Sequence, residues 1–542
     1  MIRLLFCFLL VSTTWGQEES KYQRKSITHI EGLFRLDASA NNLSSAEQSN
    51  IIYQVNRSMQ MGRFDFNPMP QSVWQELQSQ SRAMRISTTE ELRQLLESLI
   101  LTSLSQTIED SSMSRAETLQ SESQKQSFMT QKAKSLDITS DQYQKILNSA
   151  YIYVPTISDI RIRSKKYTDG YGYEASLKLG LAWYQIQYDQ EGNSSLIMIA
   201  HTQSEGIGEM SGRNYRSSYK TIAFRNALSK AIQNLQLDTK KMDQFRLRAQ
   251  ITRGGIRTAE MDLGVISGIK INQKFRLYDM IQEGDFLYRE ESGWTFVQES
   301  DSNSSVLHLV SSTASIGQSL DEIPLVGYAL DVKYNQFNWT STPDSFPGKK
   351  AWKFSSFQGI SVGPTKDISG AWGWNHFYVG AQFGMAFSNI DAQIATEDGV
   401  LYTLDSPFYF NMKFHARKMF HVWNRLFWGL EMDLGIYALG MTLNDENSTD
   451  PYQRISSRWY GNTVSASILG ELALSPKWSV KGNLGQQYGS YLEQYYVIDG
   501  NESECIDSNL PCFAVNLNSL HLSLSLEYKF ERLASYFQRM FL

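Results

Sequence analysis

The sequence predicts a multidomain chain: an N-terminal α/β (or α+β) domain, a small β module and a C-terminal antiparallel transmembrane β-barrel of about eight strands. The C-terminal part alternates apolar and polar residues over segments long enough to cross a membrane. The N-terminal half instead carries apolar residues at helical spacing, and the chain begins with the pattern of an export signal. A length of 542 residues leaves room for two to four domains.

Residues 1–16 predict a secretory signal peptide. Arg3 precedes the apolar run Leu4–Val11, and Thr14 and Gly16 occupy the small positions before a cleavage site. This run is too short to cross a bilayer as a helix, and no later segment is apolar over the roughly 18 residues that a helical span needs.

Residues 17–244 predict the α/β domain. Ser44 with Glu47, and Thr88 with Glu91, form capping-box patterns ahead of apolar residues at helical spacing. A third helical stripe runs from Phe224 to Leu235. Strand candidates lie between the helices, at Gly32–Leu36, Arg63–Phe66, Tyr151–Val154, Tyr173–Tyr188 and Leu196–Ala200. This mixed order predicts one sheet with helices over it, and the Ser/Gln-rich stretch Glu109–Lys134 is expected to be a solvated helix or a mobile insertion.

Residues 245–320 predict a small β module. Short strand patterns separated by glycine-containing turns occur at Phe245–Ile251, Gly268–Tyr278, Trp294–Val297 and Val306–Val310.

Residues 324–530 predict the barrel. The strand candidates are Val326–Tyr334, Ser355–Val362, Phe377–Phe387, Phe408–Arg417, Leu426–Ala438, Val464–Leu474, Trp478–Tyr488 and Asn518–Phe530. From Leu520 to Phe530 every second residue is apolar, so one face would contact lipid and the other would line the interior. Long polar connections alternate with short ones, as expected for outer loops and inner turns. A soluble β-sandwich is the alternative, and residues 531–542 are expected to form an amphipathic tail.

The polar face of these strands carries charges of both signs. The candidate residues of the barrel interior are Lys413, Arg417, Glu431, Asp433, Glu471, Lys481 and Glu527. Eight strands enclose a space only wide enough for side chains, and buried charges need partners. We therefore expect a paired network, with a proton or ion path as the alternative, and the mixture of signs favours no single ion class.

Two cysteines remain after signal cleavage, Cys505 and Cys512, both in the last predicted outer loop. An exported protein meets oxidising conditions, so a disulfide is expected, and a pair of free thiols is the alternative.

Residues 27–319 resemble a known type of periplasmic domain. A helix, a strand ending in Gly62-Arg-Phe-Asp-Phe66, a long strand pair and the helix Tyr219–Leu235 are similar to the domains of curli secretion channels and flagellar T-rings. The segment Gly268-Ile-Lys-Ile-Asn-Gln-Lys-Phe275 resembles the SH3-like module that follows in some of them. Curli channels pool strand hairpins from several subunits, whereas this chain has a complete barrel pattern of its own, so the secretion activity is not transferred. The C-terminal part resembles small eight-stranded outer-membrane barrels.

Catalytic and cofactor motifs are missing from the sequence. Its seven histidines have no metal-ligand spacing, no Cys–His cluster occurs, and Gly206, Gly208 and the pair Gly254-Gly255 are interpreted as turn glycines rather than a phosphate loop. Of the barrel histidines, His376 and His421 are expected at the inner end, which argues against an outer-leaflet acyltransferase. We expect no enzyme activity, no cofactor and no metal, and a net charge of −5 without a basic block argues against nucleic acid as a partner.

These features predict a protein of the Gram-negative outer membrane with its N-terminal domain in the periplasm. The first functional hypothesis is a structural or assembly role in which the barrel anchors a domain that binds a periplasmic partner. The second is a surface protein that binds an extracellular ligand or adheres through its outer loops, and the third is a narrow channel.

Overall fold

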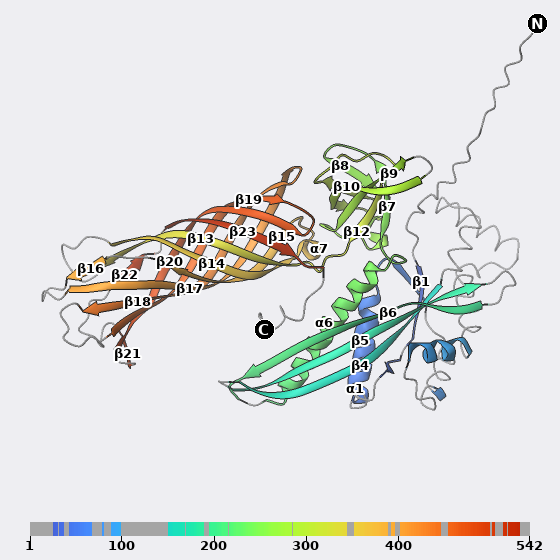
Figure 1. Cartoon of the computed structure of the whole chain (residues 1–542), viewed down its shortest axis with the longest axis horizontal. Helices are drawn as coiled ribbons and strands as arrows, with labels where there is room; N and C mark the ends of the chain where they lie inside the picture. The colour runs from blue at the N-terminus through green and yellow to red at the C-terminus, as the bar shows by residue number, and fades with distance from the viewer. Residues whose placement is uncertain are drawn as a thin grey trace, which may run out of the picture.

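The computed structural model describes residues 25–30, 32–36, 43–67, 79–80, 88–98, 150–167, 170–188, 194–214, 216–283, 286–343, 352–388, 392–395, 401–445, 454–498, 501–504, 513–516 and 519–531. The chain forms three parts in sequence order, an α/β domain, a small barrel and a large barrel (Figure 1). The predicted signal peptide, the stretch Glu109–Lys134, Cys505, Cys512 and the tail after Glu531 lie outside the described residues.

The α/β domain is built on one six-stranded sheet. Its strands are β1 (Lys25–His29), β2 (Phe34–Arg35), β3 (Phe64–Asn67), β4 (Ala150–Tyr167), β5 (Gly170–Tyr188) and β6 (Ser194–Gly212). The order is β3-β1-β4-β5-β6, with β2 also paired to β4; β1 is parallel to both neighbours, and β4, β5 and β6 are antiparallel. β4 and β6 are much longer than their predicted segments, because their outer halves are rich in charged and polar residues and lose the apolar pattern before the strand pairing ends.

Two helices, α1 (Ser45–Met59) and α6 (Ser218–Lys241), pack against this sheet. Ser44 caps α1 in the predicted capping box, and Thr88 and Glu91 form the second box, with both backbone–side-chain distances 3.2 Å. The interpretation of Gly206 and Gly208 as turn glycines is wrong, since both lie within β6 under α6. A Cβ atom at Gly208 would lie 2.1 Å from the Ala223 carbonyl oxygen, so glycine is needed for the close approach of the helix.

The small barrel is a closed ring of six strands. They are β7 (Arg248–Arg253), β8 (Thr258–Met261), β9 (Lys274–Glu283), β10 (Phe286–Ser300), β11 (Ser305–Leu309) and β12 (Ser319–Ile323), and the short helix η2 (Val265–Ser267) follows β8. Buried aliphatic side chains and Phe275 fill its core. Arg63 of the α/β domain forms an ion pair with Glu322 of β12, with a shortest N–O distance of 2.7 Å, so these two parts share a buried contact.

The large barrel confirms the predicted eight antiparallel strands. They are β13 (Tyr328–Pro343), β14 (Trp352–Asp367), β15 (Phe377–Phe387), β17 (Leu401–Trp423), β18 (Leu426–Asp445), β19 (Arg454–Ala473), β20 (Trp478–Ile498) and β23 (Ser519–Lys529). Each pairs with the next, and β23 returns to β13, which closes the ring. The short strands β16 (Ala392–Ala395), β21 (Asn501–Glu504) and β22 (Phe513–Asn516) extend the end far from the small barrel.

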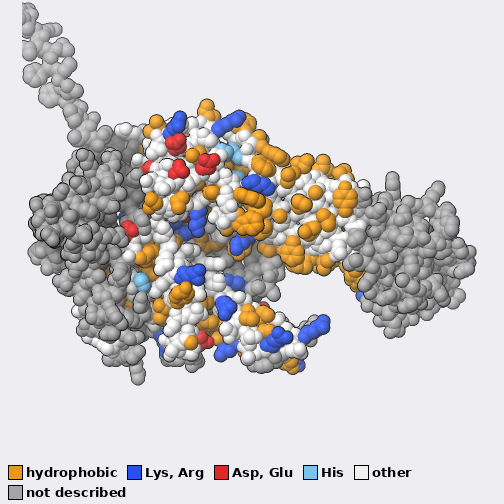
Figure 2. All heavy atoms as spheres, turned by 180° about the vertical axis from the view of Figure 1, so that it is seen from behind, with side chains coloured by type: hydrophobic (Ala, Val, Ile, Leu, Met, Phe, Trp, Pro, Cys, Tyr) orange, Lys and Arg blue, Asp and Glu red, His pale blue; other side chains and the backbone are white. Residues whose placement is uncertain are grey.

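The predicted alternation of apolar and polar residues gives the large barrel an apolar outer surface and a polar inner surface. On β23 the leucines from Leu520 to Leu526 point outward and are 44–63% exposed, while Ser519, His521, Ser523, Ser525 and Glu527 are buried inside. The outer surface is hydrophobic over much of its height (Figure 2). At 11–23 residues the strands reach or exceed the ~9–11 residues that a tilted membrane strand needs. Most run further than predicted because backbone pairing continues into the expected loops.

Among the described helices, none combines the length and the apolar character required to cross a membrane.

Candidate functional site

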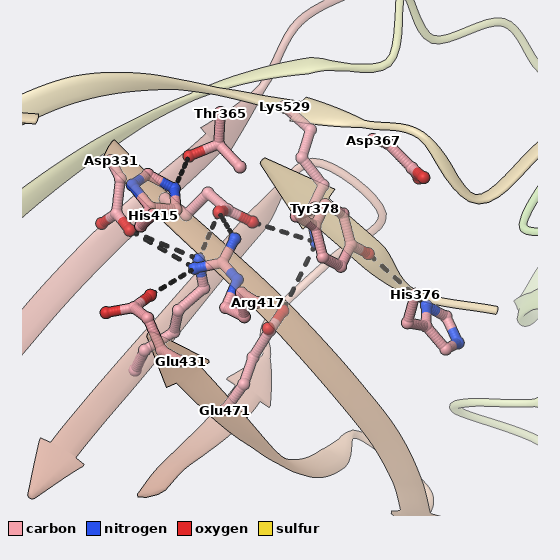
Figure 3. Close-up of polar contacts among 12 residues, drawn as sticks. Asp331, Thr365, Asp367, His376, Tyr378, His415, Arg417, Glu431, Glu471 and Lys529 are labelled. Atoms are coloured by element: carbon pink, nitrogen blue, oxygen red, sulfur yellow. Dashed lines mark hydrogen bonds and ion pairs between the residues drawn. The ribbon is translucent and has the colours of Figure 1, made fainter. Parts of the chain in front are cut away.

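The interior of the large barrel is filled by a charge network centred on Arg417 (Figure 3). Its guanidinium lies 2.6 Å from Glu527, 3.5 Å from Asp331 and 3.8 Å from Glu431, measured between nearest N and O atoms. The guanidinium also lies 5.0 Å from the centre of the Tyr378 ring. Since three strands supply these carboxylates, Arg417 links distant parts of the ring through its side chain.

Lysines complete the network. Lys333 contacts Glu431 at 2.8 Å, and Lys481 pairs with Glu527 and lies 3.6 Å from Asp331. Lys529 lies 3.4 Å from Glu471. Further along the barrel, Ser465 donates to Asp433 at 2.6 Å and Lys413 donates to Gln487 at 3.0 Å.

The network is electrically balanced. Its five carboxylates are Asp331, Glu431, Asp433, Glu471 and Glu527, and its five cations are Lys333, Lys413, Arg417, Lys481 and Lys529. Nine of these ten residues are buried, and Lys529 is nearly so. A neutral network in the described part of the interior gives no preference for either sign of ion.

Strand register explains why the charges must be bridged. Asp331 on β13 and Glu527 on β23 are direct cross-strand partners, and like charges in that position repel each other. Arg417 from β17 and Lys481 from β20 both contact this pair, so cations from other strands compensate the repulsion.

The structure places all seven sequence-predicted interior residues inside the barrel. Four of them meet in one cluster: Arg417, Glu431, Lys481 and Glu527. Glu471 joins this cluster through Lys529. Lys413 and Asp433 lie further along the barrel. The candidate set lacked Asp331 and Lys333, although the alternation of their strand already placed them on the polar face.

The small barrel covers one mouth of the large barrel. We call this end the docked mouth. Trp294 and Phe296 of β10 are 4% and 1% exposed and pack in one cluster with large-barrel side chains. The cluster contains Tyr378, Met419, Phe427, Leu469 and Ala473 from the large barrel, and Val310 and Ile323 from the small barrel. Polar contacts support it: Lys274 donates to the Pro476 carbonyl at 2.8 Å, and Asn272 donates to Asp367 and Tyr378.

The sequence contains a signal for this contact that the strand predictions did not use. In the run Trp294–Val297, Val297 points into the core of the small barrel, while Trp294 and Phe296 point the other way. A strand that is apolar on both faces is covered on both faces, and a free-standing module would expose a polar outer face there.

Histidines from both barrels surround Phe296 at the docked mouth. His376 precedes β15, and its ring centre lies 4.3 Å from that of Phe296; His308 of β11 lies 5.0 Å from His421 of β17. Burial, with a smaller contribution from His421, lowers the pKa of His308 to about 4, and burial holds the pKa of His376 well below its usual range. Both rings are therefore neutral near pH 7.

Acidification is expected to weaken the docking of the two barrels. Because the folded pKa of His308 lies below its unfolded value of about 6.5, its contribution is complete above about pH 6.5 and is lost as the pH falls towards 4. The strength of docking is measured by the protease sensitivity of the chain between the two barrels, compared at pH 7.5 and pH 5. A His308→Gln variant should show a smaller pH dependence, because His376 still titrates at the same contact. His201→Gln, a change in the α/β domain, should keep the full dependence; an unaltered pH response in His308→Gln would contradict the assignment.

A cavity of about 540 Å³ lies where α6, the small barrel and the docked mouth meet. Lys240, Lys270, Lys274, Lys366 and Lys529 line it, against the carboxylates of Glu322 and Asp367. Burial lowers the pKa of Lys240 to about 8. The short helix α7 (Ser369–Trp372) lies at one side, with Trp372 and Trp374 exposed on the rim of the large barrel.

No set of His, Cys, Asp and Glu side chains suited to a metal ion occurs in the part of the chain that the structure describes. The cavity lining contains no serine, cysteine or histidine among the described residues, so it does not present a nucleophile with a neighbouring imidazole base.

No protein-family model and no curated protein matches this sequence. Solved structures that are similar to it include three that match 37–38% of this chain and nearly all of their own length. A major outer membrane protein of Thermus thermophilus has 12% identity and a TM-score of 0.28, over 38% of this chain and 99% of that one. Neisserial surface protein A has 11% identity and a TM-score of 0.22 (37% and 99%), and the attachment invasion locus protein Ail of Yersinia pestis has 12% identity and a TM-score of 0.21 (37% and 98%). The first two are by name an outer membrane protein and a surface protein, and the likeness of this chain to all three concerns the barrel fold alone.

Proposed function

We propose that this chain is a non-catalytic outer-membrane protein whose large barrel anchors the small barrel and the α/β domain on the periplasmic side and holds them in a fixed orientation. The observation that carries the proposal is the covered docked mouth, where an apolar cluster and hydrogen bonds join the two barrels. The buried Arg63–Glu322 pair then joins the small barrel to the α/β domain. Two successive buried junctions suit a protein that presents a domain at a set position for a periplasmic partner.

The outer surface of the large barrel supports the membrane assignment. Met432, Leu434 and Ile436 on β18 point outward and are about 60% exposed. Aromatic side chains gather at the docked end of this apolar band, where Phe420 stacks on Trp428 and Trp478 lies against Tyr528. Tyr460 and Tyr488 are exposed towards the other end, as in the two aromatic girdles of membrane barrels.

A narrow channel is disfavoured on the same grounds. The interior holds a neutral network of buried side chains, and the small barrel covers one mouth. Surface binding through the outer loops stays a prediction, because most of those loop residues lie outside the described part of the chain.

A charge placed on the lipid-facing band tests the anchor. Met432→Arg is expected to lower the free energy of barrel folding into bilayers by about 2–4 kcal/mol, because it places a cation near the middle of the apolar band. Val422→Arg, close to the turn between β17 and β18, should cost only about 0–1 kcal/mol. Urea titration of the reconstituted protein measures both, and equal small effects would speak against lipid contact at Met432.

The presentation role is tested with a photo-cross-linker at Tyr53, which is exposed on α1, in intact cells. Periplasmic proteins captured by the native chain should be lost with Trp294→Ala/Phe296→Ala, while heat-modifiable gel mobility shows that the large barrel still inserts. Equal capture by the docked and undocked forms would overturn the fixed-orientation proposal.

A further inference from the structure

The cavity beside the docked mouth is built from all three parts of the chain, and we call it the junction cavity. Its volume of about 540 Å³ lies within the range of small-molecule sites, about 300–1,000 Å³. The α/β domain supplies the C-terminal end of α6, which lies close to β12 of the small barrel (Figure 1). The small barrel also supplies residues 270–274, and the large barrel supplies α7 and the ends of β13 and β14.

Each of the three parts contributes a lysine to the junction cavity. Lys240 comes from the last turn of α6, Lys270 from the segment before β9, and Lys366 from β14. Within the described part of the chain, none of these three ammonium groups forms an ion pair with a carboxylate. Lys366 instead lies over the Tyr328 ring, 5.3 Å from its centre. Assembly of the three parts therefore brings three cations without acidic partners to one cavity.

The two carboxylates of the described lining are already engaged by other groups. Arg63 binds both oxygens of Glu322, with N–O distances of 2.7 and 3.0 Å. Asp367 accepts hydrogen bonds from the Asn272 side chain and from the Ser369 backbone. Because Arg63 neutralises Glu322, three lysines face the single remaining charge of Asp367.

The surroundings of Lys240 show the cost of this excess of cations. Burial lowers the pKa of Lys240 to about 8, and the positive charges of Arg63 and Lys270 act in the same direction, against the charge of Glu322. These groups face Lys240 from the segment before β3, from the segment before β9 and from β12. An anion in the cavity would relieve the repulsion between the cations and replace the water that Lys240 has lost.

A phosphate group matches this lining better than a carboxylate does. A phosphate monoester carries a charge close to −2 at neutral pH and has three strong acceptor oxygens, one for each of the three ammonium groups. Apolar side chains line another part of the cavity, among them Ile323, Leu325 and Ile368, and they suit the carbon skeleton of an ester. Soluble phosphate esters and phospholipid headgroups both provide this chemistry.

We propose that the junction cavity binds a phosphate ester, held by Lys240, Lys270 and Lys366. The bound anion links the three parts of the chain and stabilises their docked arrangement. A ligand that binds only the docked form shifts the docking equilibrium by a factor of one plus the ratio of free ligand to Kd, about tenfold at nine times Kd. This inference goes beyond the anchoring role, because the cavity is complete within the chain and needs no membrane.

The test follows the phosphorus NMR line width of glycerol 3-phosphate added to the full chain in a non-ionic detergent. We expect the native protein to broaden the line. Lys240→Gln, Lys270→Gln and Lys366→Gln should each weaken binding at least about tenfold, because each removes a hydrogen bond between charged groups. Lys220→Gln and Arg253→Gln, which change exposed cations outside the cavity, should bind like the native chain. Circular dichroism and heat-modifiable gel mobility verify that every variant is folded.

Short-chain lipids distinguish the two sources of the phosphate group. Dioctanoyl phosphatidylglycerol is titrated against bound glycerol 3-phosphate. Displacement at concentrations below those of glycerol 3-phosphate itself assigns the site to a lipid headgroup, and binding without displacement assigns it to a soluble ester. Dioctanoyl phosphatidylcholine should not displace the probe, because its choline cation faces the lysines; displacement equal to that by phosphatidylglycerol would show that the acyl chains bind instead and would overturn the proposal.

The pH profile tests the role of Lys240 directly. Glycerol 3-phosphate remains a dianion from pH 7.5 to pH 9.5, because the second pKa of a phosphate monoester is about 6. Its affinity for the native chain should therefore fall as the pH rises through about 8, where Lys240 loses its proton, and Lys240→Arg should flatten this profile. The proposal fails if neither probe binds the native chain, if the cavity variants bind like the native chain, or if Lys240→Arg keeps the native profile. None of these results bears on the membrane anchor, since no bilayer is present.

Discussion

An Arg417→Met variant is expected to lose about 3–5 kcal/mol of barrel stability, because removing one partner of a buried ion network leaves the others uncompensated. Arg417 is 1% exposed and contacts Glu527, Asp331 and Glu431. Methionine retains the bulk of the side chain but leaves an interior with five carboxylates and four cations. Unfolding in urea after reconstitution, followed by tryptophan fluorescence and heat-modifiable mobility, measures the loss.

A second substitution separates charge balance from packing. Arg417→Met/Glu527→Gln restores four charges of each sign and should recover part of the stability. Lys366→Met, which removes an exposed cation at the end of β14, should change stability by less than about 1 kcal/mol. A single Arg417→Met variant as stable as the native protein would show that the network does not hold the barrel together.

A Glu322→Ala variant is expected to destabilise the contact between the α/β domain and the small barrel, again by about 3–5 kcal/mol. The side chains of Arg63 and Glu322 are 3% and 2% exposed and form two N–O contacts of 2.7 and 3.0 Å. Without Glu322, the Arg63 guanidinium loses both contacts to a carboxylate and keeps its hydrogen bond to the Phe245 carbonyl at 3.0 Å. Calorimetry should then show the α/β domain unfolding earlier than the rest of the chain.

The same contact should weaken in acid. Burial raises the pKa of Glu322, but Arg63, together with smaller contributions from Lys240 and the Leu247 backbone, more than offsets this, and the pKa lies below its ordinary value. A lowered carboxyl pKa gives stability that is present above the unfolded value and is lost as the pH falls through the folded value. The matched control for Glu322→Ala is Glu291→Ala, which removes the half-exposed ion pair with Arg276 at 3.3 Å. This control should lower the stability by less than about 1 kcal/mol. Rescue of Glu322→Ala by Arg63→Met would attribute the loss to the unpaired cation, and an unshifted domain transition would contradict the prediction.

The sequence revealed the large barrel because the two faces of each strand have different surroundings, an apolar outer surface and a polar interior. Lipid-side leucines such as Leu522 and Leu524 alternate with interior serines, so period-two patterning located most of the strands and their faces; the second strand, Ser355–Val362, alternates poorly. Strand ends were predicted too short, since pairing between backbones continues where the outward-facing apolar pattern ends. On β18 this happens beyond Ala438, where the apolar residues Leu439, Met441 and Leu443 fall on the opposite face. The ion partners of Arg417 come from β13, β18 and β23, and such contacts depend on the curvature of the closed ring rather than on local pattern.

The junctions between the three parts were missed for a similar reason. Arg63 and Glu322 are 259 residues apart in the sequence, and nothing in either local sequence indicates the other. Phe296 could have been identified, because its strand is apolar on both sides. The resemblance of residues 27–319 to curli-channel and T-ring domains stays a prediction.

The position of Asp331 opposite Glu527 also bears on how the ring is completed. These residues lie on the first and last strands of the large barrel, so they meet only where the two ends of the ribbon join. That seam brings two negative charges together unless Arg417 and Lys481, from strands within the ribbon, are already in place. In a ribbon that lacked those strands, the two carboxylates at its ends would repel each other. The sequence thereby favours closure of the complete eight-stranded ring over closure of a smaller ring.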